Sequence, residues 1–358
     1  MIAKADDQPT QQHWRLAPIP ALRSALAVVG AVVLALYLAG CRGSSGGQGP
    51  TASSHPAVPS YRVTATVPLG KSAGWLAVDP GTHAVYVTHV KGNAVSVIDA
   101  STHTVTATVP VGTNPYGVAV DPGTHTVYVV NHDDNTVSVI DASTRTVTAT
   151  VPVGKKPFGV AVDPGTHTVY VTNNGETTVS VINGATHTVA ATVALGEGDR
   201  GVSKTPTGVA VDPGTHTVYV VNDPDEVSVI DGSTRTVIAA PRVGFDPIGV
   251  AVDPDTHTVY VTSRDNNVAL IDGSTRTVAA TVPVGKDPFG VAVDPGTHSV
   301  YVTNSDDSTV SVIDGPARTV AATVPVGNGP GPVAADPGTH SVYVAVSGDN
   351  SVSVIQSR

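Results

Sequence analysis

Histidine is the residue whose number and spacing in this chain first suggest chemistry. Seven of the 13 histidines close one short motif, Asp-Pro-Gly-Thr-His or Asp-Pro-Asp-Thr-His. They are His83, His125, His167, His216, His257, His298 and His340. The ligands of one zinc ion lie roughly 3–4 Å apart, because each bond is about 2 Å long, and equivalent side chains of separate repeats are farther apart than that. We therefore expect a structural role, with each imidazole bonding locally in its turn. A shared metal and a seven-fold response to pH are the alternatives.

Two further histidines, His89 and His132, fall outside this motif, in corresponding loops of adjacent repeats. An enzyme needs a few convergent acid and base side chains in a pocket, and these two imidazoles are the sequence's one lead toward such a site. The chain has no recognisable nucleophile motif, and its single cysteine excludes a Cys-x-x-Cys-His haem attachment. We therefore expect neither a metal nor another cofactor, and we leave open whether the protein is an enzyme.

Acidic residues cluster in three of the equivalent loops. The clusters are Asp133-Asp134-Asn135, Asp223-Pro224-Asp225-Glu226 and Asp306-Asp307-Ser308. Carboxylate oxygens suit Ca²⁺, but none of these loops has the twelve-residue spacing of a calcium loop. Short polar hairpins use Asp and Asn in any case, so turn formation is the favoured interpretation and calcium the alternative.

These residues sit in a unit of about 40 residues that the chain repeats seven times, most regularly at residues 114–154. The aspartate that opens the turn marks each copy, and successive copies are 42, 42, 49, 41, 41 and 42 residues apart. It recurs at Asp79, Asp121, Asp163, Asp212, Asp253, Asp294 and Asp336. A period near 40 that contains four strand-like segments is typical of a propeller blade. The sequence therefore predicts an all-β, seven-bladed β-propeller with four antiparallel strands in each blade.

Each repeat supplies four short segments rich in Val, Thr, Ile and Tyr, which suit a pleated surface. In the second repeat they are residues 117–121, 126–131, 136–141 and 146–153. Proline in the fourth segment favours an edge strand. Residues 61–70 match a fourth segment, whereas the chain stops after a third segment at residues 351–356. We therefore expect the N-terminal strand to complete the C-terminal blade and close a ring over residues 61–358.

The second segment carries a family resemblance. Residues 170–173 and 301–304 spell Tyr-Val-Thr-Asn, and residues 128–131 and 219–222 differ from it at one position. Together with the Asp-Pro-Gly-Thr-His turn, these motifs resemble the YVTN-family β-propeller repeat proteins over about residues 61–358. The resemblance implies the propeller fold and an extracytoplasmic, often surface-attached setting. It implies little chemistry, because related propellers include lactonases, streptogramin lyases and quinone- or haem-dependent dehydrogenases.

Function is expected where the copies differ, on the face formed by the interblade loops and the loops between second and third strands. We call this the upper face. A seven-residue insertion within residues 197–204 lengthens one interblade loop, and such insertions often mark a binding face. The alternative is a tolerated surface loop, with aromatic residues that merely plug the channel mouth. The expected binding-face residues are Tyr116, Lys156, Phe158, Asp199, Arg200, Lys204, Arg264 and Phe289.

An export segment precedes the repeats. Arg15 and Arg23 come before the apolar residues 25–39, and residues 38–41 read Leu-Ala-Gly-Cys. This order is typical of a secretory signal, and the last four residues resemble the bacterial lipobox, which implies cleavage before Cys41 and its lipidation. An uncleaved anchor is the alternative, although the apolar run is short of the roughly 20 residues of a span. We expect a signal peptide at residues 1–40, and a lipidated Cys41 with a Gly/Ser/Pro-rich tether at residues 41–60.

Charge narrows the possible partners. Without residues 1–40 the chain keeps 16 Lys and Arg against 27 Asp and Glu, a net charge of −11. Because phosphate neutralisation dominates nucleic-acid binding, a nucleic-acid partner is not expected. We expect a monomer on the outer face of the bacterial cytoplasmic membrane, in the periplasm or at the cell surface. Its main predicted role is a binding or scaffold module for an envelope protein, peptide or glycan. The alternative is an extracytoplasmic enzyme of the lactonase or lyase type.

Overall fold

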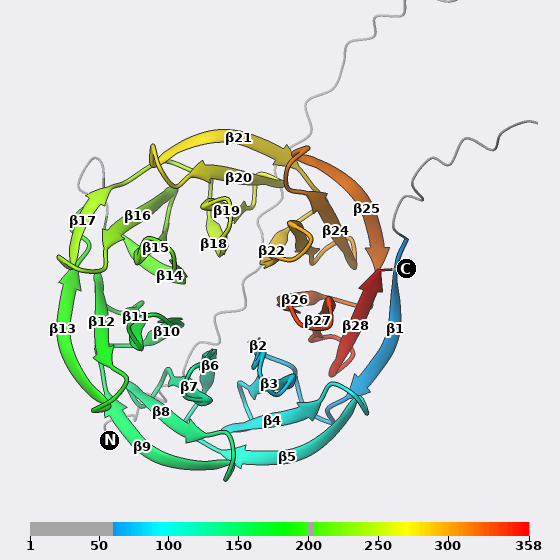
Figure 1. Cartoon of the computed structure of the whole chain (residues 1–358), viewed down its shortest axis with the longest axis horizontal. Coiled ribbons are helices and arrows are strands. Elements are labelled where there is room, and N and C mark those ends of the chain that lie inside the picture. Colours follow the sequence, from blue (N-terminus) through cyan, green and yellow to red (C-terminus); the bar gives the residue numbers. More distant parts are fainter. Residues whose placement is uncertain (1–59, 199–202, 358) are drawn as a thin grey trace, which may run out of the picture. The chain divides into compact units, whose positions relative to one another are not determined.

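The computed structural model describes residues 60–198 and 203–357. The chain divides into residues 1–56 and residues 57–358, and all described strands belong to the second unit. They form seven four-stranded sheets arranged as blades around an axis (Figure 1), which confirms the predicted all-β, seven-bladed propeller. Among the described residues, no helix is long and apolar enough to cross a membrane. The predicted signal peptide, Cys41 and residues 41–59 of the tether lie outside the described residues.

Blades 1 to 7 are numbered in chain order, and their strands run from the axis outward. The first strands are β2 (Leu76–Val78), β6 (Pro115–Asp121), β10 (Pro157–Asp163), β14 (Thr205–Asp212), β18 (Pro247–Asp253), β22 (Pro288–Asp294) and β26 (Pro330–Asp336). The second strands are β3 (Ala84–His89), β7 (Thr126–Asn131), β11 (Thr168–Asn173), β15 (Thr217–Asp223), β19 (Thr258–Ser263), β23 (Ser299–Asn304) and β27 (Ser341–Val346).

The third strands are β4 (Ala94–Asp99), β8 (Thr136–Asp141), β12 (Thr178–Asn183), β16 (Glu226–Asp231), β20 (Asn267–Asp272), β24 (Thr309–Asp314) and β28 (Ser351–Ser357). The outer strands are β5 (Thr104–Pro110), β9 (Thr146–Pro152), β13 (Thr188–Ala194), β17 (Thr236–Ala239), β21 (Thr277–Pro283), β25 (Thr319–Pro325) and β1 (Tyr61–Pro68). Neighbouring strands pair antiparallel, and each proline of the fourth segment lies at the end of an outer edge strand, as predicted.

The third strands are buried on both faces. In β8 the sequence alternates Val137 and Val139 with Ser138 and Ile140, and all four side chains are buried. A blade packs between two neighbours, so neither face of its third strand meets water. Ser138 is accommodated because its hydroxyl accepts a hydrogen bond from the Asn131 amide at 2.9 Å. The Asn of the Tyr-Val-Thr-Asn motif therefore has a structural partner inside its own blade.

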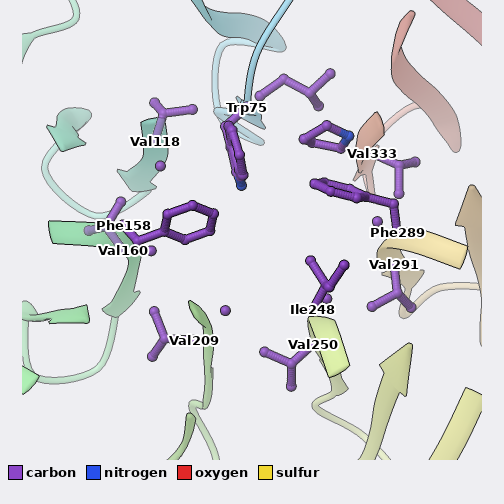
Figure 2. Close-up of a pocket in the computed structure, with 17 residues that line it drawn as sticks. Trp75, Val118, Phe158, Val160, Val209, Ile248, Val250, Phe289, Val291 and Val333 are labelled. Carbon is purple, nitrogen blue, oxygen red and sulfur yellow. The ribbon is translucent and has the colours of Figure 1, made fainter. Parts of the chain in front are cut away.

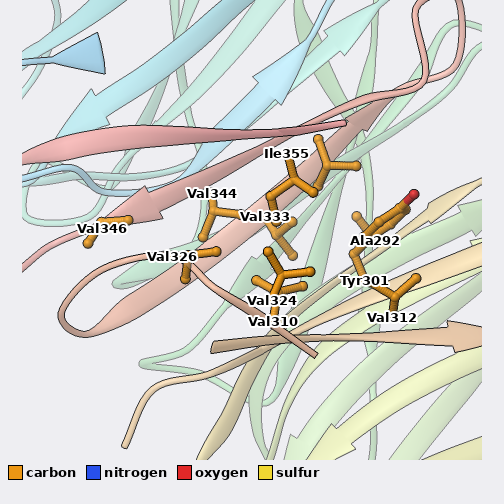
Figure 3. Packing of buried hydrophobic residues seen from close by; sticks show 11 residues of the cluster. Ala292, Tyr301, Val310, Val312, Val324, Val326, Val333, Val344, Val346 and Ile355 are labelled. Atoms are coloured by element: carbon orange, nitrogen blue, oxygen red, sulfur yellow. The ribbon is translucent and has the colours of Figure 1, made fainter. Parts of the chain in front are cut away.

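The hydrophobic core lies between successive blades. Figure 3 shows one interface, in which Val310 and Val312 of β24 and Tyr301 of β23 meet Val344 and Ile355 of blade 7. Complete burial of one such side chain is worth about 1.5–3 kcal/mol. The equivalent clusters between the other blades have the same composition, so the ring is held by a repeated interface.

The N-terminal strand closes the ring, as the sequence predicts. Strand β1 pairs antiparallel with β28, and Val67 lies opposite Val352. Tyr61 at the start of β1 packs edge-on against Tyr301 of blade 6, with ring centroids 6.1 Å apart. Blade 7 is therefore built from both ends of the described chain (Figure 1).

Candidate functional site

Four interblade connections of the upper face present a large side chain toward the axis. They share a backbone in which a residue of positive φ (47–56°) precedes a buried proline; these residues are Asn114, Lys156, Asp246 and Asp287. In three of these loops a side-chain amide oxygen of the preceding blade fixes this conformation, as where Asn135 accepts a hydrogen bond from the Lys156 backbone at 2.7 Å. At Asp246 the acceptor is the Pro224 backbone carbonyl, at 2.8 Å. The residue after the proline then faces the channel. These residues are Tyr116, Phe158, Ile248 and Phe289.

An aromatic cluster surrounds the mouth of the axial channel. Trp75 packs against Tyr116, Phe158 and Phe289 with ring centroids 4.9, 5.1 and 6.1 Å apart. Trp75, Phe158, Phe289 and Ile248 line a cavity of about 190 Å³, and Figure 2 shows their side chains around its centre. Valines of the first strands line the remainder of the cavity. The predicted residues Phe158 and Phe289 thus meet in one apolar site, and Tyr116 stands at its rim.

Trp75 is a site residue that our sequence reasoning missed. It occupies the position at which five other repeats carry glycine, at Gly117, Gly159, Gly208, Gly249 and Gly290. This departure from the repeated glycine is the sequence signal by which Trp75 could have been identified as a site residue. Phe158, Phe289 and the likewise missed Phe245 are the three phenylalanines of the chain, and all belong to interblade loops of the upper face. Apart from Tyr61, the described aromatic residues that are not part of the repeated core therefore gather on this face.

A charged rim lies beside the cavity over blades 4 to 6. The Nε of Arg264 lies 3.0 Å from a carboxylate oxygen of Asp246 and 3.4 Å from one of Asp287. Asp246 and Asp287 each stand two residues before a cavity-lining residue, Ile248 and Phe289. Phe245 is next in sequence to Asp246, and 62% of it is exposed to solvent. The predicted residue Arg264 thus lies near the mouth, held between two carboxylates.

Two carboxyl groups of this rim hold protons more tightly than usual. Burial raises the pKa of Asp223, and the nearby carboxylate of Asp246 raises it further. Burial also raises the pKa of Asp287, and Asp306 and Asp246 add to this effect against the opposing charge of Arg264. A group of this kind in or near a pocket is a candidate functional residue.

The predicted lysines lie in different environments. Lys156 is exposed, in the interblade loop that ends at Phe158. Lys204 is buried: its ammonium lies 2.5 Å from a carboxylate oxygen of Glu226 and donates to the Leu195 carbonyl at 3.1 Å. Removing one partner of such a pair leaves an uncompensated buried charge, so Lys204 serves the fold of the lengthened loop. Asp199 and Arg200 lie outside the described residues.

The two non-repeat histidines do not converge on one pocket. His89 ends β3 at the position of the motif asparagine and is 2% exposed, and its ring nitrogens bond the Ser96 hydroxyl at 2.7 Å and the Ser72 carbonyl at 3.1 Å. Burial lowers its pKa. His132 stands at the rim, with its Nδ1 2.7 Å from Asp133 and its ring centroid 5.0 Å from that of Tyr116. His89 therefore replaces a structural asparagine, and only His132 faces the candidate site.

The seven turn histidines join successive blades on the lower face, opposite the upper one. Each Nδ1 bonds the buried turn aspartate of the preceding blade rather than a group in its own turn, so the expected local bond is wrong. The pairs are His83–Asp336 (2.8 Å), His125–Asp79 (2.8 Å), His167–Asp121 (2.7 Å), His216–Asp163 (2.7 Å), His257–Asp212 (2.8 Å), His298–Asp253 (2.9 Å) and His340–Asp294 (2.8 Å). A Cβ on Gly81 would lie 2.7 Å from the His125 ring, which explains the glycine in this turn.

One turn adds a third possible metal ligand. Blade 5 carries Asp255 where the other turns carry glycine, and Asp253, Asp255 and His298 each place one donor atom within 4.8 Å of the others. Because the His–Asp part of this cluster recurs in every other blade, we attribute it to the interblade bond. The acidic loops of the upper face also have a repeated structural use, since Asp134 and Asp307 accept backbone hydrogen bonds from the interblade loops at 2.6 and 2.8 Å.

Comparisons with known proteins agree with the fold. Residues 211–345 match the family described as Cytochrome D1 heme domain. A solved structure of hydrazine synthase from Kuenenia stuttgartiensis is similar to this chain, with a TM-score of 0.69 and 21% sequence identity, over 79% of this chain and 95% of that one. No curated protein matches the chain. At this level of identity, the likeness shows that the two chains share a fold.

Proposed function

We propose that this protein is an exported binding module that captures its ligand at the channel mouth of the upper face. The observation that carries the proposal is the aromatic cluster of Trp75, Tyr116, Phe158 and Phe289 around an apolar cavity. Binding sites are concave and mostly apolar, with a few placed polar groups, and the rim of Asp246, Arg264 and Asp287 supplies those groups. The ligand is a small molecule, or an exposed part of an envelope protein, peptide or glycan.

The proposal includes membership of the YVTN-family propellers and attachment to a membrane through Cys41. The lipobox-like residues 38–41 and the repeated motif at residues 170–173 and 301–304 support these two points. With a tether of about 19 residues at up to about 3.3 Å per residue, the lipid anchor would allow the propeller to stand about 60 Å from the membrane.

The name of the matched family raises the question of a haem, and the cavity does not fit one. Haem iron takes an axial His, Cys, Met or Tyr ligand. None of these is among the residues that line the cavity, and its volume of about 190 Å³ is below the roughly 300–1,000 Å³ of ordinary ligand pockets. The four histidines in the matched segment bond aspartates on the lower face. We therefore derive no chemistry through a haem.

An extracytoplasmic propeller enzyme, lactonase- or lyase-like, is the second candidate. The likeness to hydrazine synthase and the match to an enzyme-type propeller family favour it, and Asp223 and Asp287, whose pKa values burial raises, are candidate acid and base groups. Its test is the hydrolysis of dihydrocoumarin, an aromatic lactone, by wild type and by Asp223→Asn and Asp287→Asn. Turnover that both variants lose would favour the enzyme over the binding module.

Trp75 gives a direct test of the binding site. The chain has two tryptophans, so Trp14→Phe in the full-length protein leaves Trp75 as the sole indole, at the wall of the cavity. We expect its fluorescence to change on titration with members of a panel of methyl glycosides, aromatic acids and aromatic amines. Phe158→Ala and Phe289→Ala should weaken that response at least tenfold.

The control is Val147→Ser on the outer edge of β9, far from the channel, which should leave the response unchanged. A panel that leaves Trp75 fluorescence unaltered, or a response that survives both phenylalanine substitutions, would contradict the proposal.

A further inference from the structure

Resting on the proposed function, we infer that the ligand of the upper face is an organic cation whose apolar part enters the channel mouth and whose charge lies over blades 4 to 6. The inference deepens the proposed site by assigning the chemical class of its ligand. It depends on the charges of the rim, on the exposure of Phe245 and on the size of the cavity.

The rim carries more negative charge than it can neutralise. Asp223, Asp246, Asp287 and the nearby Asp306 supply four carboxyl groups. Against them stand two cations, the guanidinium of Arg264 and the exposed ammonium of Lys286. Burial is the main cause of the raised pKa values of Asp223 and Asp287, and the neighbouring carboxylates raise both further, because each disfavours the ionised form of the others. A cation placed here would relieve that repulsion, whereas an anion would increase it.

Arg264 does not turn this rim into an anion site. Its Nε is held between Asp246 and Asp287 at 3.0 and 3.4 Å, so its charge is already compensated by two carboxylates. A second arginine of this sector, Arg242, is likewise paired, since its guanidinium lies 3.1 Å from a carboxylate oxygen of Asp225. One further cation of this sector is the exposed Lys286, next to Asp287, and it leaves the carboxylates in excess. Other exposed lysines of the face lie elsewhere, as Lys155 and Lys156 do in the loop between blades 2 and 3.

Aromatic side chains stand on both sides of this charge. Phe245 is exposed at the rim next to Asp246, and Phe289, two residues after Asp287, packs against Trp75 in the cavity wall. Aromatic faces attract cations, and a combination of aromatic rings and carboxylates is suited to alkylammonium groups. The cavity of about 190 Å³ admits only part of a drug-sized molecule, so the ammonium group would remain at the rim.

Three probes with a common benzyl group test the inference. They are benzyltrimethylammonium, its neutral isostere neopentylbenzene and the anion benzylphosphonate, titrated into the full-length Trp14→Phe protein with Trp75 fluorescence as the readout. We expect the ammonium probe to bind at least tenfold more tightly than the neutral probe and the phosphonate to bind most weakly. Raising the salt concentration should weaken the ammonium probe alone.

Charge variants of the rim separate this result from unspecific apolar binding. Asp223→Asn and Asp287→Asn should each weaken the ammonium probe about fivefold and leave the neutral probe unchanged, whereas Arg264→Leu should strengthen the ammonium probe. Thermal unfolding of each variant confirms that it folds. Equal affinity for the ammonium and neutral probes would overturn the cation inference and leave the binding site in place. Tighter phosphonate binding, weaker ammonium binding by Arg264→Leu, or no response to any of the three would also overturn it.

Discussion

Single residues in this protein are best understood by comparison with their copies in the other blades. His89 is an example, because it stands where blades 2, 3, 4 and 6 carry the motif asparagine and bonds the serine of the third strand as those asparagines do. We predict that His89→Asn leaves the free energy of unfolding within about 1 kcal/mol of wild type, since one buried hydrogen-bonding group replaces another. His89→Ala should lower it by about 2–3 kcal/mol, because the Ser96 hydroxyl and the Ser72 carbonyl lose their partner. Chemical denaturation measures both.

If His89→Asn abolished an activity without loss of stability, His89 would have a catalytic role.

The turn aspartate of blade 1, Asp79, makes folding depend on pH. The buried carboxylate of Asp79 accepts hydrogen bonds from the Gly81 backbone, the Thr82 hydroxyl and His125. Burial alone would raise its pKa, but these bonds together lower it below the usual value. Its ionised form therefore contributes stability that is complete above the unfolded pKa of about 3.9 and is lost as the pH falls through the lower folded value.

We accordingly predict that Asp79→Asn costs about 2 kcal/mol at neutral pH and makes the loss of stability below about pH 4 less steep. The single variant His125→Ala and the double variant complete a cycle that measures the interblade bond. Its coupling free energy should be about 1–2 kcal/mol at pH 7. Additive effects would show that the bond contributes nothing to the joining of blades 1 and 2.

Among the strands, β1 matters most for closure of the ring. It comes from the N-terminal end of the described chain, whereas the other three strands of blade 7 come from the C-terminal end. Without it β28 becomes an edge, and the buried residues Val352 and Val354 are uncovered. We predict that a chain starting at residue 69 aggregates or unfolds at least 10 °C lower than a chain starting at residue 57. Size-exclusion chromatography and thermal unfolding measure this. A peptide of residues 60–70 should restore the shorter chain, and a stable truncated protein would show that closure is dispensable.

The strands and the closure of the ring by β1 could be predicted because the weak strand pattern of one repeat recurs seven times. A Val-Ser-Val-Ile segment alone is ambiguous, but seven copies at a fixed distance from the same turn leave one architecture. The hydrogen-bond partner of each turn histidine could not be predicted in this way. The partner aspartate belongs to the preceding blade, and the distance between the two side chains depends on how the blades are arranged in the ring. Phe158 and Phe289 were predictable as departures within a position that varies. Trp75 was missed although its departure from a repeated glycine was visible in the sequence. Arg264 was predicted, but its carboxylate partners Asp246 and Asp287 and the nearby Asp223 belong to other loops, so their meeting depends on the geometry of the ring.

The whole molecule combines a sealed ring with one irregular face. The seven lower-face His–Asp pairs and the interblade cores repeat around the axis, so they stabilise the ring and distinguish no blade from another. The upper face differs from blade to blade in both aromatic and charged residues. A ligand site that needs several different groups can arise only where such symmetry is broken, so the fold and the proposed function occupy opposite faces.

This division has a consequence for how the protein would be presented at a membrane. If Cys41 is lipidated, the tether would join the propeller at β1, the outer strand of blade 7, and not at an upper-face loop. We predict that the full-length protein, expressed in a bacterium grown with tritiated palmitate, is labelled, partitions into the detergent phase and loses the mass of residues 1–40. Cys41→Ala should remain unlabelled and at the precursor mass, because lipidation precedes cleavage at a lipobox. The contrary outcome is that the wild type is also unlabelled and uncleaved, and that both proteins stay in the detergent phase at the precursor mass. That outcome would establish residues 25–39 as an uncleaved anchor. The Trp75 response to ligand should be the same in Cys41→Ala as in wild type, since the upper face does not depend on the anchor.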